Sequence, residues 1–172
     1  MIRAKYFILV ATVGLSVAFD QVTKRLVLTG FKLGESVPVL GDFFHLTYVR
    51  NTGAAFGFLA HANEGFRVPF FIAVPVLALF AVAYVFRRIQ DDDRKLSFAL
   101  SLVIGGAIGN LLDRLRLGFV VDFLDFHWHE DYHFPAFNIA DSAICIGVGI
   151  LMLDLIMQEQ LRESKRHAPT SI

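Results

Sequence analysis

VPFFIAVPVLALFAVAYVF, residues 68–86, is the stretch of the chain that decides its fold class. It carries no charged side chain. It is long enough to cross the hydrocarbon core of a bilayer as a helix, which needs about 20 apolar residues. Pro69 lies near its start, where proline is harmless, and Pro75 can bend the helix. The stretch therefore predicts a membrane-spanning helix.

The composition of the whole chain favours a membrane protein. Hydrophobic residues make up 55% of the 172 residues and charged residues only 19%, whereas soluble domains average about 45–50% and 25%. The net charge is zero, so no overall field indicates a nucleic-acid partner. The length predicts one domain, residues 1–172. The single Cys145 excludes an internal disulfide framework and is expected to be a small core residue.

Three further apolar runs predict spans of their own. The first run is short and reaches spanning length only by continuing through Asp20 and Lys24. A cleaved signal peptide is the alternative for this run, but no convincing small-x-small site follows it, so we expect a retained anchor. With the stretch quoted above, the predicted spans are residues 6–28, 67–86, 96–113 and 138–157.

Basic residues predict the orientation of these spans. The N-terminal segment, the connection between spans two and three, and the C-terminal tail hold nine of the 16 Lys and Arg residues. Short basic segments stay on the cytoplasmic side. Both termini are therefore expected in the cytoplasm, and residues 29–66 and 114–137 outside it.

The outer segments contain their own structural signals. Residues 43–49 are rich in β-formers and follow the turn signal Gly41-Asp42, so they predict a strand in a small sheet. Residues 119–126 mix apolar residues with two Asp and fit either a strand or a helix lying in the interface. Trp128 suits that depth.

Several polar residues interrupt the apolar runs, where the bilayer disfavours them. Asp20 and Lys24 are four residues apart, so they can pair on one helix face, and a structural role is favoured for them. Asp154 is read as interfacial and without function. The others are predicted to lie toward the outer side of the membrane: Asn51, Asn110, Asp113, Arg114, Asp122, Asn138 and Asp141. One convergent polar site or a structural network would explain them equally well.

Asp122 and Asp141 stand out because no basic residue is near either in sequence. Two carboxyl groups that meet in a poorly solvated place cannot both ionise easily, so one keeps its proton. Such a pair can take a proton from water and protonate a leaving amine, which peptide hydrolysis without a covalent intermediate requires. A structural role, or a proton or cation path in a small carrier, is the alternative at this point.

Other candidate chemistry is weaker. His127, His129 and His133 lie within seven residues, with His45 elsewhere, but a wet interfacial segment explains them better than a zinc site does. Ser142 has no evident base or oxyanion hole. No phosphate-binding loop is present, because GGAIGN lies inside an apolar run and its glycines suit close helix packing.

Five motifs in order give the chain a family resemblance. They are DQVTK (residues 20–24), VRNTGAAF (49–56), GGAIGNLLDR (105–114), GFVVDF (118–123) and FNIADS (137–142). Together they make the chain resemble the lipoprotein signal peptidases (signal peptidase II), which are bacterial membrane aspartic proteases. The resemblance extends over nearly the full chain but says nothing of the acidic loop 91–93 or the tail.

The resemblance implies a fold, a reaction and roles for residues. The fold would be all-α in the membrane, with four transmembrane helices, a small extracytoplasmic β-cradle and a short periplasmic helix. The enzyme would cut prolipoproteins before a diacylglyceryl-modified cysteine at the outer face of the bacterial inner membrane. It would act without cofactor or metal, in contact with lipids and as a monomer. Asp122 and Asp141 would be the catalytic dyad. Supporting positions would be Asn51, Gly53, Asn110, Arg114, Asn138 and Ala140, and structural ones Asp20, Lys24 and Asp113.

Overall fold

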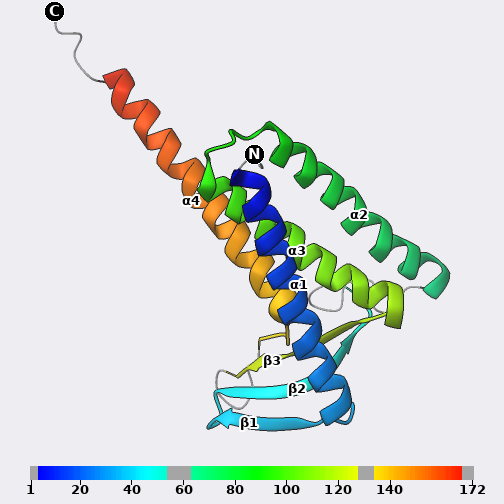
Figure 1. Cartoon of the computed structure of the whole chain (residues 1–172). Coiled ribbons are helices and arrows are strands. Elements are labelled where there is room, and N and C mark those ends of the chain that lie inside the picture. The colour runs from blue at the N-terminus through cyan, green and yellow to red at the C-terminus, as the bar shows by residue number, and fades with distance from the viewer. Residues whose placement is uncertain (1–3, 54–62, 128–133, 168–172) are drawn as a thin grey trace, which may run out of the picture.

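Four long helices and a small sheet form the part of the chain that the computed structural model describes, residues 4–53, 63–127 and 134–167 (Figure 1). The helices are α1 (Ala4–Gly30), α2 (Glu64–Arg88), α3 (Arg94–Leu117) and α4 (Ile139–His167). All four are long and apolar enough to cross a membrane. This confirms the predicted class of fold. Among the described residues outside the spans there is no short helix, and the segments 54–62 and 128–133 lie outside the description.

Helix α3 is the centre of the helical bundle. It packs against α1, α2 and α4, and its buried face is built from small residues such as Ser97, Ala99 and Ser101. A Cβ added at Gly105 would come within 2.8 Å of Ser16 in α1, and one at Gly106 would collide with the Ala140 carbonyl of α4. The small residues therefore let α1 and α4 approach α3 closely, as the glycine-rich motif predicted.

Capping residues mark both ends of α3. Asp93 caps the start of α3, and Gly118 ends it in the left-handed conformation with φ of 78°. Arg114, the first residue of the predicted outer segment 114–137, lies in the last turn of α3. Helix α4 extends to His167, past the predicted membrane span, which ends at residue 157.

The sheet consists of β1 (Ser36–Leu40), β2 (Phe44–Asn51) and β3 (Val120–Phe126). The order is β1-β2-β3 and both pairings are antiparallel. An irregularity in β2 lies between Leu46, opposite Leu124, and Val49, opposite Asp122. The structure thus confirms the predicted strand at 43–49 and decides residues 119–126 in favour of a strand. Strand β1 was not predicted, since Pro38 argues against a strand.

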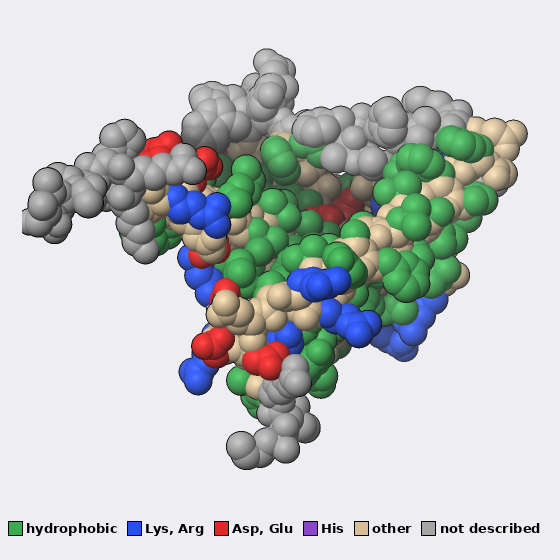
Figure 2. Space-filling view, turned by 90° about the horizontal axis from the view of Figure 1, so that it is seen from above, with side chains coloured by type: hydrophobic (Ala, Val, Ile, Leu, Met, Phe, Trp, Pro, Cys, Tyr) green, Lys and Arg blue, Asp and Glu red, His purple; other side chains and the backbone are tan. Residues whose placement is uncertain are grey.

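The sheet lies at one end of the bundle, and the N-terminus, the α2–α3 connection and the far half of α4 lie at the other (Figure 1). Seen from that second end, charged side chains gather around the helix ends and hydrophobic side chains cover their flanks (Figure 2). Val27 of α1 packs with Tyr48, Val121 and Phe123 of the sheet in one buried cluster. This cluster fixes the position of the sheet relative to the bundle.

One expectation about a single residue is wrong. Cys145 is exposed on α4 and is not a core residue. Asp154, read from the sequence as interfacial, forms an ion pair with Lys95 at 2.8 Å and accepts a hydrogen bond from Gln158. The pair joins α3 to α4 at the end of the bundle opposite the sheet.

Candidate active site

The candidate site lies where the sheet meets the bundle. Asp122 projects from β3, and Asp141 lies in the first turn of α4. Asn138 precedes that helix and caps it: its Oδ1 accepts from the Asp141 N–H at 3.0 Å, and Asp141 Oδ2 accepts from the Asn138 N–H at 3.2 Å. This reciprocal cap fixes the start of α4. Asp141 is consequently held in place by the backbone of its own helix.

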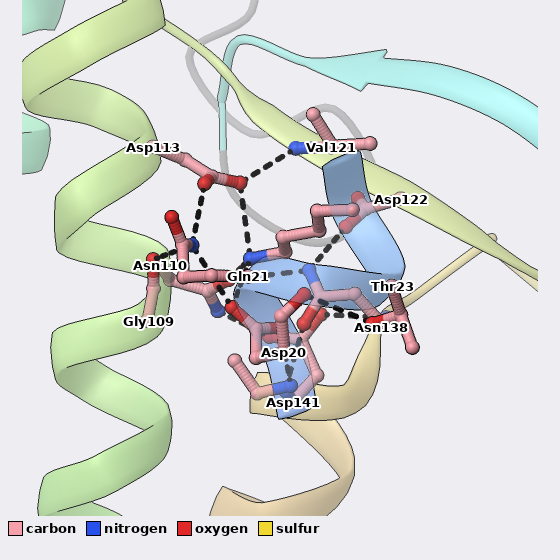
Figure 3. A network of polar contacts seen from close by, with 12 residues as sticks. Asp20, Gln21, Thr23, Gly109, Asn110, Asp113, Val121, Asp122, Asn138 and Asp141 are labelled. Atoms are coloured by element: carbon pink, nitrogen blue, oxygen red, sulfur yellow. Dashed lines mark hydrogen bonds and ion pairs between the residues drawn. The ribbon is translucent and has the colours of Figure 1, made fainter. Parts of the chain in front are cut away.

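The Asn138 side chain connects the two carboxyl groups. Its Nδ2 donates to Asp122 Oδ1 at 2.6 Å and to Asn110 Oδ1 at 3.2 Å (Figure 3). Asn110 Nδ2 in turn donates to Asp141 Oδ1 at 2.7 Å. Asn138 is fully buried, so these hydrogen bonds are not shared with solvent. A short chain of amides therefore runs from one carboxyl group to the other.

Each carboxyl group accepts two N–H donors. Asp122 accepts from Asn138 and, through its Oδ2, from Asn51 Nδ2 at 3.0 Å. Asp141 accepts from Asn110 and from the Asn138 backbone. The three amide residues thus come from β2, from α3 and from the start of α4. The sequence predicts three amides and two unpaired carboxylates on the outer side of the membrane. The fold brings all five together: Asn51, Asn110, Asp122, Asn138 and Asp141.

Asp122 has the environment of a carboxyl group that can keep its proton at neutral pH. It is only 2% exposed, whereas Asp141 is partly exposed. Burial and the neighbouring charge of Asp141 raise the pKa of Asp122 to about 7, although the amides of Asn51 and Asn138 lower it. Near neutral pH the pair can therefore contain one acid and one base.

A second polar cluster lies against the first. Lys24 Nζ contacts Asp20 Oδ2 at 2.9 Å, Asp113 Oδ2 at 3.0 Å and Asn110 Oδ1 at 2.8 Å. The predicted pairing of Asp20 with Lys24 is thereby confirmed, and Asp113 joins them. Gln21 was missed as a member, although it stands beside Asp20 in the sequence: its Nε2 donates to Asp113 Oδ1 at 2.9 Å. Only its position on the α3-facing side of α1 could have indicated this.

The predicted positions Gly53, Arg114 and Ala140 border the site. Arg114 Nη2 donates to the Gly53 carbonyl at 3.3 Å, and its guanidinium lies 5.4 Å from the centre of the Phe71 ring. Arg114 also lines a small, open hollow, together with Thr52, Arg67, Val68, Phe71 and Gly118. Ala140 contributes its backbone N–H, which donates to Asp20 Oδ1 at 2.9 Å.

The weaker candidates do not join the carboxyl pair. Ser142 Oγ donates to the Asn138 carbonyl, so its proton is held by a backbone oxygen and not by a general base. The rings of His45 and His127 lie tilted against each other with centres 4.4 Å apart. They are near Asp125, which points to the sheet face opposite Asp122. His129 and His133 lie outside the described residues, and within the described part no group of His, Cys, Asp and Glu could hold a metal ion.

The fold and the site together define a multi-pass membrane protein with a carboxyl pair at one end of its helical bundle. The chain belongs to the signal peptidase II family, whose model matches residues 12–157. It is 49% identical to the lipoprotein signal peptidase of Geobacter metallireducens, over 95% of this chain and 98% of that protein. It is 52% identical to that of Syntrophotalea carbinolica, over 95% and 97%.

Two solved structures share the fold of this chain. A bacterial membrane enzyme solved in meso at 2.3 Å resolution has a TM-score of 0.77 and 34% identity, covering 95% of this chain and 93% of its own. A second such structure at 1.9 Å resolution has a TM-score of 0.75 at the same identity. The protein is thus a membrane protease of the lipoprotein signal peptidase family.

Proposed function

We propose that this protein is an aspartic endopeptidase that removes signal peptides from prolipoproteins by cutting before a diacylglyceryl-modified cysteine. The observation that carries the proposal is the arrangement of Asp122 and Asp141, which are linked through Asn138 and Asn110. Both carboxyl groups lie at the junction of sheet and bundle, where α4 begins. Family membership supplies the substrate class.

The two carboxyl groups divide the chemistry between them. Asp141, which is partly exposed, takes a proton from water as the water oxygen attacks the scissile carbonyl carbon. Asp122, whose pKa near 7 lets it hold a proton, gives that proton to the carbonyl oxygen. As the tetrahedral intermediate collapses, Asp141 returns its proton to the leaving amine nitrogen and Asp122 recovers its own from the intermediate. Both groups end the cycle as they began it.

The amides keep these roles distinct. Asn51 and Asn138 donate to Asp122, and Asn110 donates to Asp141, so neither carboxyl group can rotate freely. Holding catalytic groups in the reactive geometry removes an entropic cost from the chemical step. Arg114, bound to the Gly53 carbonyl at the edge of the site, is placed to contact a substrate carbonyl. The amides and Arg114 therefore serve to position the reacting groups.

The position of the dyad suits a lipidated substrate. The acyl chains of a diacylglyceryl-cysteine remain in the bilayer, so the peptide bond beside that cysteine lies at the membrane surface. The dyad lies at one end of four apolar helices rather than at their middle. Basic residues concentrate at the opposite end, which we assign to the cytoplasm, with both termini there and the dyad at the outer face of the inner membrane.

Cleavage of a defined substrate tests this function. The purified protein is given a diacylglyceryl-modified prolipoprotein peptide, and the products are identified by mass spectrometry. We expect one cut, directly before the modified cysteine, and no cut in the same peptide without lipid. Cleavage elsewhere, or equal cleavage of both peptides, would contradict the proposal. Activity should also survive EDTA; loss with EDTA and recovery with zinc would instead point to the histidines.

A further inference from the structure

The buried ammonium group of Lys24 is linked to both carboxyl groups of the dyad through the residues that it contacts. Lys24 is 2% exposed, and its three donors are satisfied by Asp20, Asp113 and Asn110 at 2.8–3.0 Å. An uncompensated charge at such a position would be strongly unfavourable, so the two carboxylates compensate it. The two carboxylates of this cluster also bind the backbone next to each catalytic residue.

Two carboxylates connect Lys24 to the backbone N–H groups of the residues that directly precede Asp141 and Asp122. Asp20 Oδ1 accepts from the N–H of Ala140 at 2.9 Å, and Ala140 directly precedes Asp141. Asp113 Oδ2 accepts from the N–H of Val121 at 3.1 Å, and Val121 directly precedes Asp122 (Figure 3). The start of α4 and strand β3 are thus attached, through one carboxylate each, to the same ammonium group.

The third contact, together with the hydrogen bond from Asn138 Nδ2 to the same oxygen, fixes the direction of the Asn110 amide. Asn110 Oδ1 accepts from Lys24, and an ammonium group can only donate. The Oδ1 of Asn110 must therefore face Lys24, which turns its Nδ2 toward Asp141, where it donates at 2.7 Å. If Asn110 rotated by half a turn, an amide oxygen would face the Asp141 carboxylate.

We propose that Lys24 is the positioning residue of the dyad. It sets the distance between the Asp122 and Asp141 carboxyl groups, and it turns Asn110 Nδ2 toward Asp141 as a hydrogen-bond donor. The proposal rests on the function proposed above. It differs from a purely structural role, in which Lys24 would only hold α1 against α3. A structural role predicts lost stability without any change in the chemistry of the protein that remains folded.

Lys5 provides a matched control. It is also a buried lysine of α1, 3% exposed, with an ion pair to Asp91 at 2.9 Å and a hydrogen bond to the Ile89 carbonyl at 2.9 Å. It lies near the start of α1, at the end of the bundle away from the dyad. Replacing Lys5 by Met should lower stability and leave kcat, KM and the pH profile of the folded protein unchanged.

The test compares Lys24→Met with Lys5→Met on the lipidated peptide, per mole of folded enzyme. Misplacing a catalytic group by about 1 Å can cost about 100-fold in rate, so we expect kcat of Lys24→Met to fall by about that factor. KM should change by less than about threefold, because the substrate contacts remain. The pH profile should also shift, since the separation of the carboxyl groups sets how strongly they disfavour joint ionisation.

A second variant covers the case in which Lys24→Met does not fold. Asp20→Asn/Lys24→Met replaces one carboxylate and one ammonium by neutral groups, so the net charge of the cluster is unchanged. The new amide oxygen at position 20 can still accept from Ala140. The same fall in kcat and the same shift of the pH profile are expected.

A folded Lys24 variant with wild-type kcat and pH profile would overturn the proposal. So would a fall in kcat that matches the fall produced by Lys5→Met. Failure of the proposed function has a different signature, because the wild type would then not cleave the peptide, or Asp122→Asn and Asp141→Asn would cleave it normally. The two failures are therefore distinguishable in one set of assays.

Discussion

Asn138 donates a 2.6 Å hydrogen bond to Asp122 while its own backbone N–H and side-chain oxygen bind Asp141. One residue thus contacts both carboxyl groups and also begins helix α4. Because the cap and the bridge use the same side chain, the geometry of the dyad depends on where the helix starts. Function and fold are coupled at this position.

The pH dependence of stability should report the protonation of Asp122. Its pKa in the folded protein is about 7, above the value of 3.8 expected for an unfolded Asp. Between these two values the folded state binds the proton and the unfolded state does not, so stability falls as pH rises from about 4 to about 7. The effect of this group is at most about 4 kcal/mol.

Asp122→Asn removes this titration while keeping the shape of the side chain. The variant should therefore gain stability relative to the wild type as pH rises from 5 to 8, measured by thermal unfolding in detergent. A constant stability difference between Asp122→Asn and wild type across this range would contradict the raised pKa.

Gly106 should be intolerant of even one methyl group. A Cβ there would collide with the Ala140 carbonyl and approach Ile144 to 2.7 Å. Overpacking of this kind costs about 1–3 kcal/mol, and denaturation of Gly106→Ala in detergent should show such a loss. Gly149→Ala is the matched control, because a Cβ at Gly149 meets no atom within 4 Å. Equal stability of the two variants would mean that α3 and α4 are not packed as described.

The orientation can be tested by labelling single cysteines with a membrane-impermeant maleimide. Cys145 is exposed on α4, so it is first replaced by Ser. Val37→Cys, on exposed strand β1, should react in spheroplasts, and Asp92→Cys, in the α2–α3 connection, only in inverted vesicles. The reverse pattern would place the dyad on the cytoplasmic side and refute the assignment from basic residues.

Much of the fold was predictable because the bilayer imposes a simple length rule. An uncharged run as long as residues 68–86 predicts a membrane span. The run at residues 96–113 also contains the glycines that let α3 pack against α1 and α4. The strand at 43–49 was predictable from its β-formers. Strand β1 was not, since its pairing with β2 outweighs the local preference of Pro38.

The members of the site were predictable, but their contacts were not. Polar residues within apolar runs attract notice at once, which is how Asp122, Asp141 and the three Asn were found. That Asn138 bridges the dyad depends on the approach of β3 to α4, and no spacing in the sequence encodes it. Gln21 was missed for the same reason, because its partner Asp113 belongs to another helix.

Kinetics of Asp122→Asn, Asp141→Asn and the double variant test the central claim most directly, namely that the two carboxyl groups act as one catalytic unit. Loss of a general acid or base costs about 100- to 10,000-fold in rate. Each single variant should lose at least that much of kcat, and the double variant should be no slower than the slower single one, because groups that act together are not additive. Wild-type kcat in either single variant, or losses that multiply in the double variant, would contradict the claim.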